Sequence, residues 1–167
     1  MQSPVSRIYF DANIFILMFE KKDSIALQIS NLLVKNWDKN YSTIVTSDLT
    51  FAETLVHPYR QKDEQLIQIY ENWSISNSHL EIGPINKEVL YCAAVLRATY
   101  KSLKLPDAIH LATAFLSECT HFLSDDTRLK SEYQLINHRF GITRGPLKLT
   151  VIRPTAENLS ALIEGTL

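Results

Sequence analysis

Acidic residues stand at four places where apolar segments of the chain begin or end. They are Asp11, Glu53, Asp107 and the neighbouring pair Asp125 and Asp126. Clustered carboxylates repel one another, which raises their pKa values unless a cation neutralises them. Hard oxygen ligands of this kind suit Mg²⁺ or Mn²⁺ better than zinc, which prefers histidine and cysteine. Such a site supports in-line displacement at phosphate, because one metal ion generates hydroxide and a second stabilises the leaving oxygen.

Each acid also has a structural explanation when it is taken alone. Asp107 is a favourable charge at a helix N-terminus, the acidic pair could cap the helix that follows it, and Glu53 could point to solvent. Asp11 fits such a role least well, because it interrupts the apolar residues 8–17 and a buried carboxylate without a cation is costly. The placement of the whole set at predicted strand ends favours one common site.

The histidines and the glycines carry weaker signals. His57 lies four residues after Glu53, but its position before Pro58 favours a role at a helix C-terminus. His110 lies one helical turn after Asp107 and is more typical of a packed histidine than of a substrate contact. The sequence has no glycine-rich phosphate loop, which argues against nucleotide binding through a P-loop or a Rossmann turn.

A group of basic residues precedes Asp107. Arg97, Lys101 and Lys104 are spaced i, i+4 and i+7 and would form one stripe along a helix predicted to end near Leu103. The stripe fits a solvated helix face as well as a row of phosphate contacts beside the acids. The net charge of −1 excludes a global basic field, so any nucleic-acid binding must come from a local patch of this kind.

Short β-branched and apolar segments alternate with helical patterns and predict the elements that position the acids. Strands are predicted at residues 7–10, 43–46, 79–82, 121–124 and 149–152. Helices are predicted at residues 13–19, 24–37, 48 to a point before Pro58, 63–71, 86–103, 106–115 and 156–163. This alternation favours an α/β domain with a mainly parallel sheet. Reactive groups gather beyond the C-terminal ends of such strands, so we expect the acids to converge there.

Length and composition fit one globular domain over residues 1–167. Hydrophobic residues make up 46% of the chain and charged residues 21%, which is enough for one core without disulfides or structural zinc. The longest apolar run, residues 14–19, is too short to span a membrane, and no signal-peptide pattern is present. Cys92 and Cys119 lie far apart, so we expect reduced thiols and a cytoplasmic protein.

Four segments resemble, in order and separation, the four motifs of PIN domains. They are YFDANIFI (residues 9–16), TFAETL (50–55), LPDAIHLATA (105–114) and FLSDDTRL (122–129), and the resemblance covers about residues 7–152. PIN domains are Mg²⁺- or Mn²⁺-dependent nucleases, and their short members are mostly VapC toxins of toxin–antitoxin pairs. The resemblance implies a three-layer α/β/α sandwich with a mainly parallel, five-stranded sheet in the order 3-2-1-4-5.

The same resemblance implies roles for individual residues. The metal-site acids would be Asp11, Glu53, Asp107 and Asp126. Asn13 matches an asparagine that supports the first acid, and Ser124 stands where the family has threonine or serine. Asp125 replaces the asparagine that commonly precedes the fourth acid, so it stays an alternative to its neighbour.

Together, the residues and the resemblance predict an endoribonuclease that cuts single-stranded RNA with metal-activated water, as the toxin of a VapBC-type pair. By resemblance it would form a homodimer and bind a small antitoxin that blocks the site, through surfaces around residues 24–37 and 49–71. One alternative is a standalone PIN nuclease in RNA processing or DNA cleavage. Another is a catalytically silent binding module, although a silent site has no need of a repulsive acidic cluster. Residues 130–148 form a basic, polar connection without an assigned role.

Overall fold

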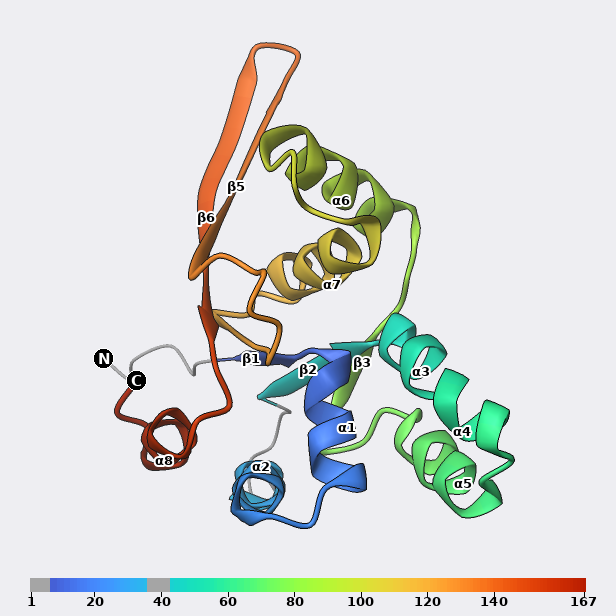
Figure 1. Ribbon diagram of the computed structural model, residues 1–167. Coiled ribbons are helices and arrows are strands. Elements are labelled where there is room, and N and C mark those ends of the chain that lie inside the picture. Colours follow the sequence, from blue (N-terminus) through green and yellow to red (C-terminus); the bar gives the residue numbers. More distant parts are fainter. Residues whose placement is uncertain (1–6, 36–42) are drawn as a thin grey trace.

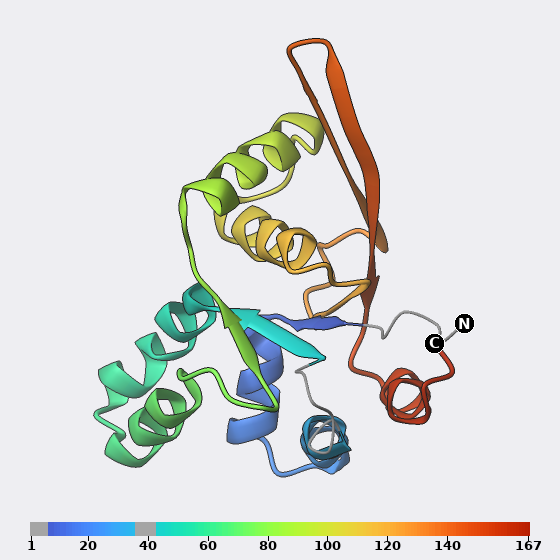
Figure 2. The ribbon, with the colours of Figure 1, turned by 180° about the vertical axis from the view of Figure 1, so that it is seen from behind.

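A six-stranded sheet with helices on both faces forms the centre of the protein (Figures 1 and 2). The computed structural model describes residues 7–35 and 43–167. The strands lie in the order β3-β2-β1-β4-β6-β5. Their bounds are β1 Ile8–Phe10, β2 Ile44–Ser47, β3 Glu81–Gly83, β4 His121–Leu123, β5 Glu132–Arg139 and β6 Ile142–Ile152. β5 pairs with β6 in antiparallel orientation, and the other neighbours pair in parallel.

The predicted order 3-2-1-4-5 is confirmed, with β6 as the fifth strand in space, but the predicted number of strands was wrong. The connection predicted at residues 130–148 forms most of a β-hairpin, β5 and β6, whose outer part projects from the sheet (Figure 1). We call residues 130–148 the arm. Residues 136–148 are exposed on both faces of the hairpin, so the alternation of apolar and polar residues that marks a half-buried strand is weak there.

Eight helices of the described residues surround the sheet. α6 and α7 cover one face of the sheet, and α1, α2 and α8 lie on the opposite side (Figure 1). Their bounds are α1 Ala12–Glu20, α2 Ser24–Lys35, α3 Asp48–Thr54, α4 Val56–Gln61, α5 Glu64–Trp73, α6 Lys87–Thr99, α7 Leu105–Leu116 and α8 Ala156–Glu164. None of these described helices is both long and apolar enough to cross a membrane. The predicted extension of α2 to Trp37 lies outside the described residues.

Two helix boundaries differ from the prediction. Pro58 does not end the helical segment, because a second helix, α4, begins at Val56 and takes the proline into its first turn. An amide hydrogen bond is not needed at that position, so proline is tolerated there. Toward the arm, α6 ends at Thr99 rather than near Leu103, and its chain leaves the helical conformation at Tyr100.

The earlier end of α6 breaks up the predicted basic stripe. Arg97 is the residue of the three that belongs to α6, and its Nε donates a hydrogen bond to the carbonyl oxygen of Leu103, 3.2 Å away. Lys101 lies in the turn after the helix, and Lys104 is the N-cap residue of α7. The premise of one helical face was therefore wrong, while the phosphate contacts themselves stay a prediction.

β1 lies between two apolar cores. The ring of Tyr9 points toward α7 and stacks on Phe122, with ring centroids 5.0 Å apart. Ile8 and Phe10 point to the opposite core, because successive residues of a strand face opposite sides of the sheet. Because β1 is buried on both faces, its position in the sheet is fixed, and so is the position of Asp11, which directly follows the strand.

The two cysteines belong to the core beneath α6 and α7. Cys92 and Cys119 are both free and buried. Burial raises the pKa of Cys92 to about 11 and that of Cys119 to about 12. Both side chains are therefore neutral thiols at neutral pH, the less reactive form.

Candidate metal centre

The C-terminal ends of β1 and β4 bring together Asp11 and Ser124, two residues that are far apart in the sequence. The two strands pair in parallel, with Phe10 opposite Leu123, so both end at the same height. The backbone N–H of Asp11 donates to the carbonyl oxygen of Leu123, 3.1 Å away. Asp11 and Ser124 consequently leave the sheet side by side.

Hydrogen bonds hold the Asp11 carboxylate in one orientation. Its Oδ1 accepts from the backbone N–H of Ala12 at 2.8 Å, which makes Asp11 the N-cap of α1. Its Oδ2 accepts from the Ser124 hydroxyl at 2.7 Å and from the Asn13 amide at 2.9 Å. The residue is only 9% exposed. Each carboxylate oxygen has two acceptor sites, so the side chain keeps acceptor capacity for a cation.

Asn13 and Ser124 also organise the segment that carries the acidic pair. The Asn13 side chain donates to Ser124 Oγ at 3.0 Å and accepts from the backbone N–H of Asp125 at 2.9 Å. Ser124 Oγ accepts in turn from the backbone N–H of Asp126 at 3.1 Å. Asp125 is exposed and takes part here through its main chain. This arrangement favours Asp126 over its neighbour as the acid that faces the site.

Glu53 reaches the same place from α3, through His110 of α7. His110 Nε2 lies 2.9 Å from Glu53 Oε2 and 3.8 Å from Asp11 Oδ1. On the other side of the ring, Nδ1 lies 2.7 Å from the hydroxyl of Tyr9, which donates to Ser47 Oγ at 2.8 Å. The hydroxyl of Tyr9 therefore holds the ring from the buried side, and Nε2 faces the two carboxylates.

Asp107 and Asp126 complete the acidic edge, but their environments differ. Burial, followed by the charges of Asp11 and Asp126, raises the pKa of Asp107. Asp126 instead accepts from the guanidinium of Arg128, with Nε 2.9 Å from Oδ1 and Nη2 2.5 Å from Oδ2. Mainly through these hydrogen bonds, Arg128 lowers the pKa of Asp126 to about 2. Burial and the neighbouring charges thus disfavour the ionised form of Asp107, whereas a cation neutralises Asp126.

A metal ion fits one part of this cluster. Within the described part of the chain, one ligand atom from each of Asp11, Glu53 and His110 lies within 4.8 Å of the other two. Two carboxylates and an imidazole form a donor set for a divalent cation. Asp107 and Asp126 do not belong to this group of three, although both act on the same electrostatic environment.

His110 is the residue whose place the sequence-based interpretation missed. It is buried, as expected of a packed histidine, but both ring nitrogens contact polar groups of the site. Its spacing of three residues from Asp107 puts the two on one face of α7 and is the signal that could have revealed it. His57, the alternative partner of Glu53, lies instead in α4.

The sequence profile of the PIN domain family matches residues 8–133. The chain belongs to the PIN domain family. The four motif segments fall within the match, whereas most of the arm and all of α8 follow it. No curated protein sequence matches significantly.

Several solved structures are similar to this PIN domain. A toxin–antitoxin complex from Klebsiella pneumoniae has 27% sequence identity and a TM-score of 0.53, covering 72% of this chain and 88% of the other. VapBC2 from Rickettsia felis, bound to a DNA fragment from its promoter, has 17% identity, a TM-score of 0.53 and coverages of 72% and 89%. The sarcin-ricin loop cleaving toxin VapC20 from Mycobacterium tuberculosis has 14% identity, a TM-score of 0.52 and coverages of 69% and 86%. The last two similarities show the fold alone.

Proposed function

We propose that this PIN domain is a metal-dependent endoribonuclease that cuts single-stranded RNA and acts in the cytoplasm as the toxin of a VapBC-type pair. The convergence of Asp11, Glu53 and His110 at the C-terminal edge of the parallel sheet carries the proposal. The similarity to a toxin–antitoxin complex over most of the chain supports the assignment as a toxin.

Carboxylate oxygens are the ligands through which the chain would hold Mg²⁺ or Mn²⁺. Asp11 and Glu53 would bind the ion directly, with His110 as a further donor, and Asp107 and Asp126 would complete the acidic shell. When bound, the ion supplies a water of lowered pKa and a positive charge beside the phosphate.

The protein's own contribution is to orient these groups before a ligand arrives. Ser124 and Asn13 fix one oxygen of the Asp11 carboxylate. His110 fixes Glu53, and Tyr9 fixes the histidine ring from the buried side. Outer partners of this kind set the orientation of metal ligands and affect metal affinity.

The proposal includes a homodimer and a small antitoxin protein that blocks the site. The antitoxin surface would be formed by residues 24–35 and 49–71, where large apolar side chains are exposed. Leu27 and Val34 of α2 are 62% and 55% exposed, and Tyr59 of α4 is 57% exposed. Such side chains gain most from coverage by an apolar partner.

RNA cleavage by the purified, antitoxin-free protein tests the proposal. We expect cleavage of single-stranded RNA with Mg²⁺ or Mn²⁺, products with a 5′-phosphate, and a loss of several orders of magnitude in the Asp11→Asn variant. Asp48→Asn is a matched control, because Asp48 is an exposed acid in the first turn of α3. Cleavage that persists in chelator would contradict metal dependence.

Two other outcomes would replace the proposed function. Metal-dependent cleavage of DNA but not RNA would indicate a DNA-directed nuclease. Binding of RNA or protein without any cleavage would indicate a silent module. A short reading frame that overlaps the start of the gene is expected of a toxin and not of a standalone nuclease.

A further inference from the structure

The arm lies almost entirely outside the part of the chain that matches the PIN family. It rises from the edge of the sheet and passes α7 and α6 (Figures 1 and 2). The family match ends at residue 133, two residues into β5. The family match therefore leaves most of the arm unexplained, and the proposed metal centre does not explain it.

The charge of the arm contrasts with that of the whole chain. The arm contains four cations, Lys130, Arg139, Arg144 and Lys148, and a single acid, Glu132. Its net charge of +3 leaves −4 on the other residues, since the chain as a whole carries −1. Glu132 pairs with Lys148, 4.0 Å away. Positive charge is thus concentrated toward the outer part of the arm, where a polyanion would be attracted.

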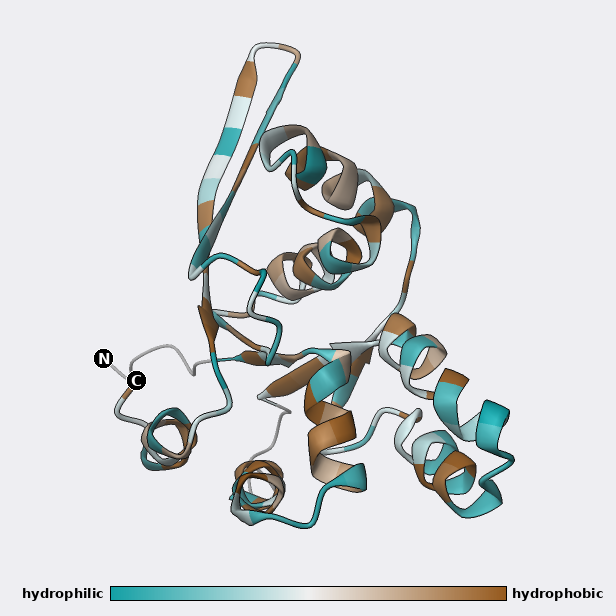
Figure 3. Cartoon of the chain, viewed as in Figure 1, coloured by the Kyte–Doolittle hydropathy of each residue, from teal (hydrophilic) through white to brown (hydrophobic). Residues whose placement is uncertain are grey.

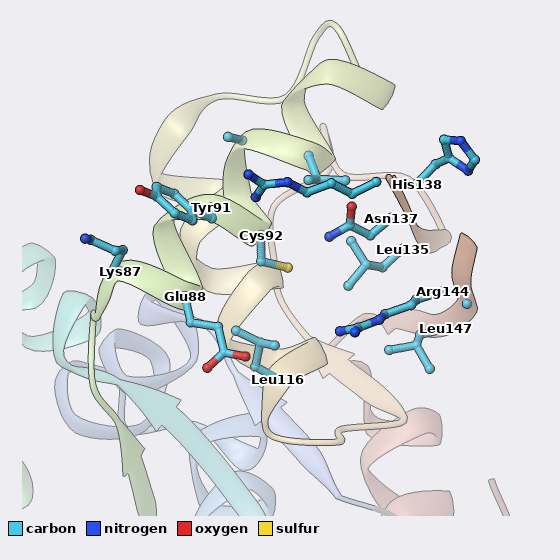
Figure 4. A pocket seen from close by; sticks show the side chains of 14 residues that line it. Lys87, Glu88, Tyr91, Cys92, Leu116, Leu135, Asn137, His138, Arg144 and Leu147 are labelled. Carbon is cyan, nitrogen blue, oxygen red and sulfur yellow. The ribbon is translucent and has the colours of Figure 1, made fainter. Parts of the chain in front are cut away.

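A groove with a volume of about 1030 Å³ lies between the arm and α6. The residues of β5 that line its arm side are Leu135, Asn137, His138 and Arg139. Lys87 and Tyr91 of α6 line the opposite side (Figure 4). The groove combines an apolar floor with cationic walls.

Solvent-exposed aromatic side chains lie at this groove and at the tip of the arm. Tyr91 is 60% exposed on the α6 side. Phe140, at the turn of the arm, is 87% exposed, and the guanidinium carbon of Arg139 lies 5.0 Å from the centre of its ring. Unstacked nucleobases bind to aromatic rings and to arginine planes of this kind.

The inner end of the arm lies beside Asp107, an acid next to the candidate metal centre. Tyr133 shares the strand face of Leu135 and lines a second, smaller cavity of about 120 Å³. Asp107, Lys104 and Lys130 line the same small cavity. Six residue steps separate Tyr133 from Arg139, a distance of roughly 20 Å along an extended strand. Tyr133 is buried, and the small cavity and the groove share no lining residue, so they are two separate hollows along the arm.

We infer that the groove between the arm and α6 binds a part of the single-stranded RNA substrate away from the acids, an inference that rests on the proposed function. The cations Lys87, Arg139 and Arg144 contact phosphates, and the exposed rings stack on bases. Three cations and one acid, Glu88, line the groove. This excess of positive charge favours a polyanion over a protein segment as the occupant.

Binding of a labelled single-stranded RNA of about 16 nucleotides, measured by fluorescence anisotropy at several salt concentrations, tests the inference. The full chain carries Asp11→Asn, so that the RNA stays intact. Replacing Arg139 and Arg144 together by glutamine should weaken binding on the order of tenfold and lower the log–log salt slope by about 1.4. The matched control replaces Lys21 and Lys22, exposed after α1, by glutamine and should leave both quantities unchanged.

The Phe140→Ala variant separates stacking from charge. We expect it to weaken RNA binding by at least about fivefold without changing the salt slope, because stacking releases no counterions. Wild-type affinity and slope in the double arginine variant would overturn the inference. A second result would also overturn it: an arm variant that differs from the wild type in molar mass, measured by sedimentation, but binds RNA equally well. The arm would then be an interface between copies of the chain.

Cleavage by the wild-type protein separates this inference from the proposed function. If the wild type cuts RNA and the arm variants bind and cut it equally well, only the arm inference fails. If the arm variants lose RNA binding but the wild type cuts no RNA with Mg²⁺ or Mn²⁺, the proposed nuclease fails and the arm stays an RNA-binding surface.

Discussion

At the candidate metal centre, neutral side chains rather than cations hold the first acid. Ser124 Oγ is fully buried and donates to Asp11, while it accepts from Asn13 and from the main chain of Asp126. One hydroxyl therefore connects three parts of the site. This explains how a carboxylate can be buried after an apolar strand without a formal counter-ion inside the protein.

Removal of that hydroxyl should affect both folding and activity. In Ser124→Ala, the partners of the hydroxyl lose a buried hydrogen bond, so we expect the free energy of unfolding to fall by about 1–3 kcal/mol. RNA cleavage should fall by about 10- to 100-fold, as for other outer partners of metal ligands. Denaturant unfolding and cleavage rates measure the two effects. The exposed Ser24→Ala variant should match the wild type in both, and an equal loss there would refute the role of Ser124.

Asp107 should destabilise the metal-free protein at neutral pH. Its raised pKa means that the folded state binds a proton more readily than the unfolded state, so its charge costs stability above the folded pKa. That cost disappears as the pH falls through the folded pKa toward the ordinary value. In chelator, Asp107→Asn should therefore melt higher than the wild type at pH 7.5, and the difference should shrink at pH 4.5. A difference independent of pH would refute this account.

Asp126 should respond in the opposite direction, because Arg128 already neutralises it. The lowered pKa means that the ionised carboxylate stabilises the fold above the ordinary value, and that this contribution is lost as the pH falls toward about 2. Asp126→Asn should consequently lower the stability of the metal-free protein, by less than about 1 kcal/mol, because the Arg128 side chain of the pair is largely exposed. Melting curves in chelator decide this. An increase in stability would show that repulsion outweighs the pairing with arginine.

Sequence patterns singled out the acids as candidates, but not the side chains that contact them. Asp11 could be found because it breaks an apolar stretch at the end of a strand. The contact of His110 with Glu53 could not be inferred with the same ease, because the histidine ring is held by Tyr9, a residue 101 positions away in the chain. The pairing of Asp126 with Arg128 likewise depends on a turn conformation that residue types do not specify.

Among the elements, the short buried strands were predictable and the hairpin was not. β1 and β2 are buried along their whole length and rich in large apolar or β-branched residues. The arm has no such pattern, because its outer residues face solvent on both sides. Its strand conformation is set by pairing between β5 and β6, a non-local interaction that no short window of sequence contains.

The loop after α6 attaches the base of the arm. The hydroxyl of Tyr100 accepts from the backbone N–H of Gln134 at 2.8 Å and lies 3.2 Å from its carbonyl oxygen. Tyr100→Phe should lower the free energy of unfolding by about 1 kcal/mol and speed amide exchange at Gln134. Hydrogen-exchange mass spectrometry measures the second effect. Tyr91→Phe is the control, and equal exchange in both variants would contradict the attachment.

At the scale of the whole molecule, the part of the antitoxin surface that lies on α2 is expected to be separate from the acids. The acids lie at the C-terminal edge of the sheet. The helix α2, which carries exposed apolar residues, lies instead on the side of the sheet away from α6 and α7 (Figures 1 and 3). Leu27→Asp should therefore preserve RNA cleavage and growth arrest on expression, while rescue by the co-expressed antitoxin is lost. Growth assays with and without the antitoxin measure this. Full rescue of the variant would exclude Leu27 from the antitoxin surface.

The chain enters and leaves the arm at adjacent points of the sheet. Glu132 lies opposite Thr150, and Tyr133 lies opposite Leu149. Tyr133 and Leu149 are buried in the core. Everything beyond these two pairs can in principle be shortened to a tight turn, or exchanged for another hairpin, with the parallel strands and the acids left in register. The arm is thus a position at which hairpins can be exchanged. Such an exchange could change substrate preference, in evolution or in the laboratory, while the acids and the reaction they support stay the same.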